Sequence, residues 1–140
     1  MELDDVVVEA IETPGHSFDH VSFLIDGRLF TGDLIGSRKV LVAMRGENYR
    51  EIIDSVKRVL SLDFEKAYGG HVVLTREEIE EFLDYLLELK SGVEELHREG
   101  KTPEEIVDIL LASVPEKVLL MEKVSDMEWS RLNLVSSLLP

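Results

Sequence analysis

Cysteine is absent from this 140-residue sequence, and histidine occurs only four times. The absence of cysteine excludes disulfides and thiolate metal sites, so any metal ion has to be bound by histidine, aspartate or glutamate. His16, His20, His71 and His97 are therefore the first candidates for chemistry. His97 lies among charged residues in a helical pattern, and we interpret it as an ordinary surface side chain.

Basic residues are also scarce: 15 lysines and arginines stand against 29 acidic residues, which gives a net charge of −14. No lysine and arginine cluster forms the basic face that a nucleic acid or an anionic membrane surface requires. No apolar run approaches the roughly 20 residues of a membrane-spanning helix, and the start, Met-Glu-Leu-Asp-Asp, is not that of a signal peptide. We therefore expect a soluble, cytoplasmic protein that binds neither nucleic acid nor membrane.

Hydrophobic residues make up 44% of the chain, enough for a real core. Strand-like runs come first, at 6–12, 21–25 and 28–32. Asp-Gly at 26–27 predicts a two-residue type I′ hairpin turn between the second and third runs. Residues 34–46 read as loop.

Helical patterns fill the rest, apart from a short strand predicted at 64–68. Apolar residues at helical spacing predict a helix over 47–60. A capping box at 75–78 predicts the start of another, which continues to about Glu99, with Gly92 as a possible break. Further boxes at 102–105 and 125–128 predict the starts of two more helices.

His16, Asp33 and His71 each lie beside glycine at or just past the end of a predicted strand. Loops at strand ends often carry chemistry, and glycine lets the backbone approach a ligand closely. Histidine and aspartate suit zinc, manganese or iron. His20, four residues after His16, is placed to orient a neighbouring loop or ligand by a hydrogen bond. Taken singly, Asp33 also suits a turn, and His16 also suits an ordinary polar loop.

In combination and in order, Thr13-Pro14-Gly15-His16 with His20, Thr31-Gly32-Asp33 and Gly69-Gly70-His71 resemble the second half of the metallo-β-lactamase superfamily. The resemblance implies an α/β (α+β) fold that forms half of an αββα sandwich. Residues 1–75 would form that half, and residues 76–140 would form a helical C-terminal extension packed on it.

The resemblance also implies a chemistry. His16 would bind a first metal, Asp33 would bridge two metals, His71 would bind the second, and His20 would support the site without binding metal. The metal would be zinc, or manganese or iron. A metal-activated water would be the nucleophile of a hydrolase that acts on a small ester, thioester or lactam-like substrate.

The superfamily's His-x-His-x-Asp-His motif is absent from this sequence. Three ligands divided between two metal positions fall short of a catalytic site, so we expect the isolated chain to bind metal poorly and to be inactive. Side chains alternate between the two faces of a strand. One apolar face of strands that contain residues such as Val7, Phe23 and Ile25 would therefore lack the half of the fold that normally packs on it. We therefore expect a homodimer, or association with a partner chain that carries the missing half.

Three functions stay open at this point. The chain is the metal-binding half of a hydrolase, a non-catalytic truncated homologue that acts as an oligomerisation or structural module, or one side of a single-metal redox or sensor site built across a dimer. A segment of a longer enzyme, a split-gene product and a shortened homologue would each explain the missing motif.

Overall fold

A computed structural model describes residues 2–3 and 5–140. Within these residues, a six-stranded sheet in the order β1-β2-β3-β4-β6-β7 stands beside a two-stranded sheet of β5 and β8. The strands are β1 (Glu2–Leu3), β2 (Val6–Glu12), β3 (Val21–Ile25), β4 (Arg28–Gly32), β5 (Ala43–Met44), β6 (Lys66–Gly69), β7 (Val73–Thr75) and β8 (Trp129–Ser130). The helices are α1 (Tyr49–Leu60), α2 (Arg76–Arg98), α3 (Pro103–Leu110), α4 (Glu116–Val124) and α5 (Arg131–Leu138). This mixture of sheet and helices confirms the predicted α/β class.

The predicted hairpin joins β3 to β4. Asp26 and Gly27 have φ values of +48° and +72°, and positive values at both positions are what a type I′ turn requires. β4 pairs antiparallel with β3 and parallel with β6. Because β4 and β6 run in the same direction, the loops that follow them, which carry Asp33 and His71, emerge at the same edge of the sheet.

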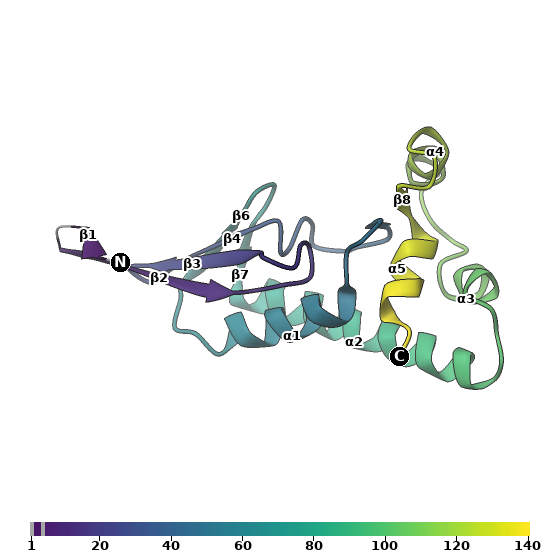
Figure 1. The fold of residues 1–140 in the computed structure, drawn as a ribbon, viewed down its shortest axis with the longest axis horizontal. Helices are drawn as coiled ribbons and strands as arrows, with labels where there is room; N and C mark the ends of the chain where they lie inside the picture. Colours follow the sequence, from purple (N-terminus) through teal and green to yellow (C-terminus); the bar gives the residue numbers. More distant parts are fainter. Residues whose placement is uncertain (1, 4) are drawn as a thin grey trace.

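One face of the sheet is covered by α1 and α2 (Figure 1). Leu29, Ala67 and Leu74 are neighbours across β4, β6 and β7 on this face, and all three are buried. Apolar side chains of the two helices pack into the same core: Ile52, Val56, Val59, Ile79, Phe82 and Leu86. Burying each large side chain contributes about 1.5–3 kcal/mol, so this layer holds the sheet and the two helices together.

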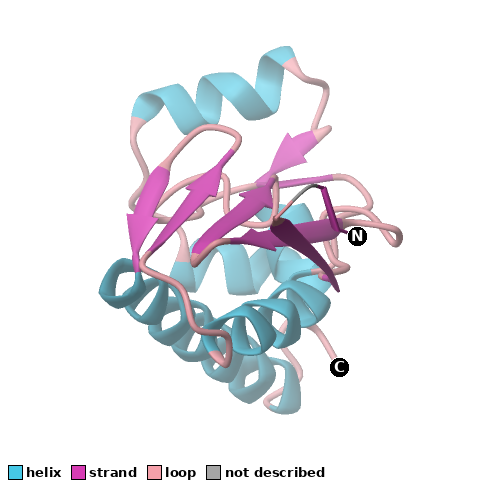
Figure 2. Cartoon of the chain, turned by 90° about the vertical axis from the view of Figure 1, so that its left-hand side faces the viewer, coloured by secondary structure: helices cyan, strands magenta, loops and turns pink. Residues whose placement is uncertain are grey.

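The opposite face of the sheet carries a row of apolar side chains. Phe23, Phe30, Tyr68 and Val73 are neighbours from β3 to β7; we call them the outer row. Phe30 and Tyr68 stack with ring centroids 5.4 Å apart, and Phe23, Phe30 and Val73 are 42%, 39% and 49% exposed. The helices α3, α4 and α5 lie beyond one end of the sheet (Figure 1), and Figure 2 views the sheet from its other end, with helices against one of its faces.

Two of the predicted capping boxes are confirmed. Thr75 and Glu78 exchange side-chain and backbone hydrogen bonds at the start of α2, and Thr102 and Glu105 do the same at the start of α3. The predicted break at Gly92 is wrong, because α2 runs through it to Arg98. A Cβ at Gly92 would lie 3.3 Å from Leu110 Cδ1, so this glycine allows α3 to pack closely on α2.

The third predicted box, Ser125 to Glu128, is wrong. Asp126 and Met127 adopt positive φ values of 52° and 62°, which no helical turn contains. The Ser125 hydroxyl instead accepts a hydrogen bond from the Trp129 N–H at 3.1 Å. The last helix starts later, at Arg131, where the Ser130 side chain accepts from the Asn133 N–H and caps α5.

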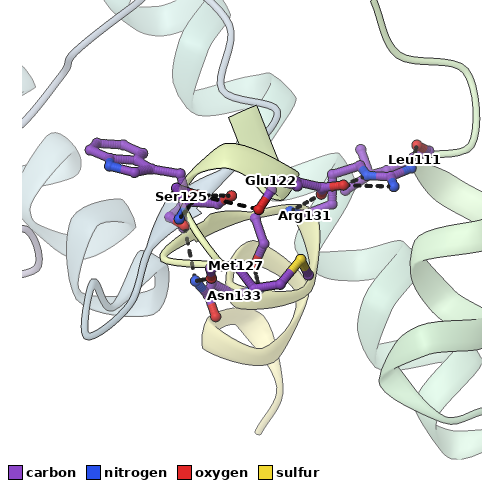
Figure 3. Close-up of polar contacts among 9 residues, drawn as sticks. Leu111, Glu122, Ser125, Met127, Arg131 and Asn133 are labelled. Carbon is purple, nitrogen blue, oxygen red and sulfur yellow. Dashed lines mark hydrogen bonds and ion pairs between the residues drawn. The ribbon is translucent and has the colours of Figure 1, made fainter. Parts of the chain in front are cut away.

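A nearly buried ion pair ties α4 to α5 (Figure 3). Arg131 donates from Nε to Glu122 Oε1 at 2.8 Å and from Nη2 to Oε2 at 2.9 Å. Its Nη1 donates to the Leu111 carbonyl just after α3 at 3.0 Å. Burial by itself raises the pKa of Glu122, but the hydrogen bonds and charge of Arg131 together hold that pKa below its ordinary value. Among the described residues, no helix combines the length and apolarity needed to cross a membrane.

Candidate metal centre

The loop that carries His16 joins β2 to β3 and packs on the start of α1. The Thr13 N–H donates to the His20 carbonyl at 3.0 Å and closes the loop, while the Asn48 N–H donates to the Gly15 carbonyl at 2.8 Å. Gly15 has a φ of +136°, and a Cβ there would lie 2.7 Å from the Ile52 backbone nitrogen. Only glycine permits this approach, which fixes His16 beside the first turn of the helix.

Glu47 orients His16. His16 Nδ1 lies 2.8 Å from Glu47 Oε1, and the second oxygen, Oε2, accepts from the Met44 N–H at 2.7 Å. The ionised carboxylate only accepts hydrogen bonds, so the imidazole donates from Nδ1 and leaves Nε2 as the basic nitrogen. A carboxylate on the far nitrogen of a histidine is the usual support of a metal ligand.

Asp33 lies between two imidazoles. Its Oδ2 is 3.8 Å from His16 Nε2, and its Oδ1 is 3.5 Å from His71 Nε2. Both distances exceed those of a hydrogen bond. Two ligands of one tetrahedral zinc ion lie about 3.3 Å apart, so the two separations are close to those between ligands of one metal ion.

The structure thus brings together the three predicted ligands, which come from three separate loops. The His16, Asp33 and His71 side chains are 25%, 50% and 74% exposed, so they are open to an ion from solution. Among residues 2–3 and 5–140, however, no group of three or more His, Asp or Glu side chains is close enough to hold one metal ion. The chain provides two pairs of donors that share Asp33, and metal binding by these residues stays a prediction.

His20 is hydrogen-bonded within its own loop through Nδ1, and its Nε2 lies beside Gly32, the residue that precedes Asp33. Its Nδ1 lies 3.0 Å from the Thr13 carbonyl and 2.9 Å from Thr13 Oγ1, and Thr13 Oγ1 contacts Ser22 Oγ at 2.9 Å. The His20 ring stands edge-on to His16 with centroids 6.1 Å apart. Burial lowers the pKa of His20, although the Thr13 carbonyl opposes the shift. His20 therefore braces the loop as a neutral side chain.

A cleft of about 630 Å³ opens beside these residues, and its walls include His16, Asp33, Glu47 and His71. This volume lies within the range of small-molecule sites. The other walls come from the segment after β4, from Tyr49 of α1 and Phe82 of α2 and, unexpectedly, from four residues of α4 and β8: Lys117, Val118, Met121 and Trp129. Reasoning from the sequence missed Glu47 and these four residues. Glu47 is 31 positions from His16, and no local pattern marks such distant pairs.

Comparison with known proteins gives the family. The model of the metallo-β-lactamase superfamily matches residues 1–71. This chain belongs to the metallo-β-lactamase superfamily. The matched region ends at His71 and includes each of the three motifs that carry the resemblance, so the family expected from the sequence is confirmed.

Two curated relatives of this chain are enzymes by name. A hydroxyacylglutathione hydrolase of Glaesserella parasuis is 38% identical over 72 residues, which is 50% of this chain and 30% of the relative. An atrochrysone carboxyl ACP thioesterase of Aspergillus fumigatus is 34% identical over 74 residues, which is 49% of this chain and 22% of the relative. The chain thus matches less than a third of the length of either relative.

The fold extends through the helices at the C-terminus. A metallo-β-lactamase family protein from Thermus thermophilus superimposes with a TM-score of 0.66 at 19% identity, covering 99% of this chain and 44% of that protein. At this identity the match concerns the fold alone, and it confirms the predicted fold class. Nearly all of the chain, α3 to α5 included, corresponds to less than half of the larger structure.

Proposed function

We propose that this chain forms the metal-binding half of a metal-dependent hydrolase. His16 and Asp33 would contribute to one metal position, and Asp33 and His71 to a second. The placement of Asp33 supports this most directly, because each of its oxygens faces a different imidazole nitrogen, at 3.8 Å and 3.5 Å. Zinc, manganese and iron all accept this donor set.

The chain's own residues prepare the site for such an ion. Glu47 holds the His16 ring through Nδ1 so that Nε2 is turned toward Asp33, and Asp33 supplies negative charge between the two imidazoles. A bound divalent cation supplies Lewis acidity, which lowers the pKa of water and stabilises developing negative charge. The apolar walls of the cleft help to exclude bulk water from the reacting carbonyl.

The substrate we propose is a small ester or thioester, with lactam-like amides as the wider class. The relatives' names support this choice, because one is a hydroxyacylglutathione hydrolase and another an ACP thioesterase. Both relatives are longer than this chain, so the proposed substrate is that of the metal site once the missing ligands have been supplied.

Completing this metal centre requires further ligand side chains, because three side chains cannot fill two metal positions. We propose that a second polypeptide segment, carried by a partner chain or by a second copy of this chain, covers the outer row and supplies them. The exposure of Phe23 and Phe30 on that face supports such an interface. The same exposure also favours the alternative function, a non-catalytic oligomerisation module that binds no metal.

Zinc titration of the chain separates these functions. We expect zinc to shift the ring signals of His16 and His71 in NMR spectra, and Asp33→Asn to weaken binding to both. His97→Ala is the matched control, because His97 lies near the end of α2, outside the cleft. Molecular mass measured on the same samples shows whether zinc binding accompanies association. Histidine signals that do not respond to zinc, either in the chain alone or in its associated form, would leave the structural module as the function.

A further inference from the structure

The cleft has a polar wall and an apolar wall. Its histidines and carboxylates form the candidate metal centre, whereas Val42, Val118, Met121 and Trp129 give it a largely apolar lining. Trp129 is 38% exposed and Met121 is 42% exposed, so both offer apolar surface to a ligand. An apolar wall next to a polar reaction centre suits a molecule with a hydrocarbon body and one reactive group.

Two cations also line the cleft, Lys39 and Lys117. The Lys39 ammonium already lies over the ring of Tyr85, 5.2 Å from its centroid. Lys117, in the first turn of α4, is exposed and forms no ion pair with any carboxylate in the described part of the chain. In a protein with 29 acidic and 15 basic side chains, an unpaired lysine on the wall of a cleft is available to an anionic ligand.

We propose that Lys117 anchors a negatively charged group of the substrate, while Trp129 and Met121 pack against its hydrocarbon portion. The substrate class is then an acyl ester or thioester that carries an anionic group, with its reactive carbonyl at His16, Asp33 and His71. This inference rests on the proposed function for the identity of the reacting bond. The binding preference of the cleft, however, is testable without any reaction.

Trp129 is the single tryptophan of the sequence, so its fluorescence reports on the cleft directly. We would titrate the metal-free chain, kept in a chelator, with octanoate and with octanamide. These probes share a chain length and differ in charge. We expect both to shift the Trp129 emission to shorter wavelength, because an apolar chain then covers the indole. We expect octanoate to bind about fivefold more tightly, the upper range for an exposed ion pair.

Lys117→Gln should remove that fivefold preference and leave octanamide binding unchanged. Added salt should weaken octanoate binding to the unmodified chain and have little effect on the variant. Lys123→Gln is the matched control, since Lys123 is an exposed lysine of the same helix that does not line the cleft. Both substitutions are at exposed positions, so the fold of α4 is retained.

Equal affinities of the unmodified chain for octanoate and octanamide would overturn the proposal. It would also be overturned if the preference for octanoate were lost in Lys123→Gln, or in Lys39→Gln, and not in Lys117→Gln. The proposal would also be overturned if neither octanoate nor octanamide changed the fluorescence emission of Trp129. Because the titration contains no metal, its failure leaves the zinc experiment unaffected, and the failure of zinc binding leaves the specificity of the cleft standing.

Discussion

At the scale of single residues, the candidate centre depends on a buried carboxylate that takes no part in any motif. The Glu47 side chain is 6% exposed and joins His16 to the Met44 backbone through its two oxygens. The backbone bond fixes the carboxylate, and the carboxylate fixes both the tautomer and the orientation of the ring. His16 is thereby held in one orientation, as its proposed role as a metal ligand requires.

Glu47→Gln should weaken zinc affinity about 10- to 100-fold, the usual effect of losing such a support. The neutral amide attracts the Nδ1 proton less strongly, and its NH₂ group cannot accept from the Met44 N–H. Competition with a zinc-binding dye measures the affinity, and the nitrogen shifts of the His16 ring in the metal-free chain report the tautomer. Glu51→Gln, at an exposed position in the first turn of α1, should change neither. Unaltered affinity and ring shifts in Glu47→Gln would show that Glu47 has no part in the site.

At the scale of elements, α4 is anchored by its buried Val118 and by the Glu122–Arg131 ion pair. Its N-cap residue, Pro115, provides no side-chain hydrogen bond, and Leu119, Leu120 and Val124 are exposed. Glu122, on α4, accepts hydrogen bonds from Arg131, and Arg131 also donates a hydrogen bond to the Leu111 carbonyl just after α3. The ion pair therefore helps to hold the wall of the cleft that carries Lys117.

This ion pair predicts a pH effect. The pKa of Glu122 is lower in the folded protein than in the unfolded chain, so the pair stabilises the fold fully above the ordinary carboxyl pKa of about 4.3. The stabilisation is lost as the pH falls through the lower, folded value. Glu122→Gln should therefore reduce the free energy of unfolding by about 2 kcal/mol at pH 7, and the difference from the unmodified chain should narrow toward pH 3.

Urea denaturation followed by circular dichroism at the two pH values measures this difference. Glu116→Gln, at an exposed site in the same helix, should have little effect at either pH. If Glu122→Gln lowers the free energy of unfolding by the same amount at pH 7 and at pH 3, the charge of Glu122 is not what stabilises the fold.

At the scale of the whole molecule, the sheet is covered on one face only. The outer row presents stacked aromatic rings of Phe30 and Tyr68 to solvent, next to the edge that carries the candidate centre. Exposed apolar surface of this kind marks an interface. Under the proposed function, one partner segment would both cover this face and complete the set of metal ligands.

We expect the chain to self-associate when no other partner is present, and Phe30→Asp to make it monomeric. A carboxylate in the middle of the outer row would have to be desolvated at the interface without a partner, whereas in the monomer it stays in water. Sedimentation velocity measures the mass, and circular dichroism confirms the fold. Val124→Asp, at a 73% exposed position of α4, is the control and should associate normally. If Phe30→Asp and the unmodified chain have the same mass, association does not use this face.

The sequence by itself determined the family, the hairpin turn, two helix starts and the three candidate ligands, because each depends on residues adjacent in the chain. Positive φ at Asp26-Gly27 and the two confirmed capping boxes are local properties of this kind. The tertiary structure decided the rest. It placed Glu47 on His16, carried α2 through Gly92 and brought Lys117 and Trp129 to the cleft. These contacts join residues far apart in the chain, and packing and burial select them, so no local pattern could have indicated them.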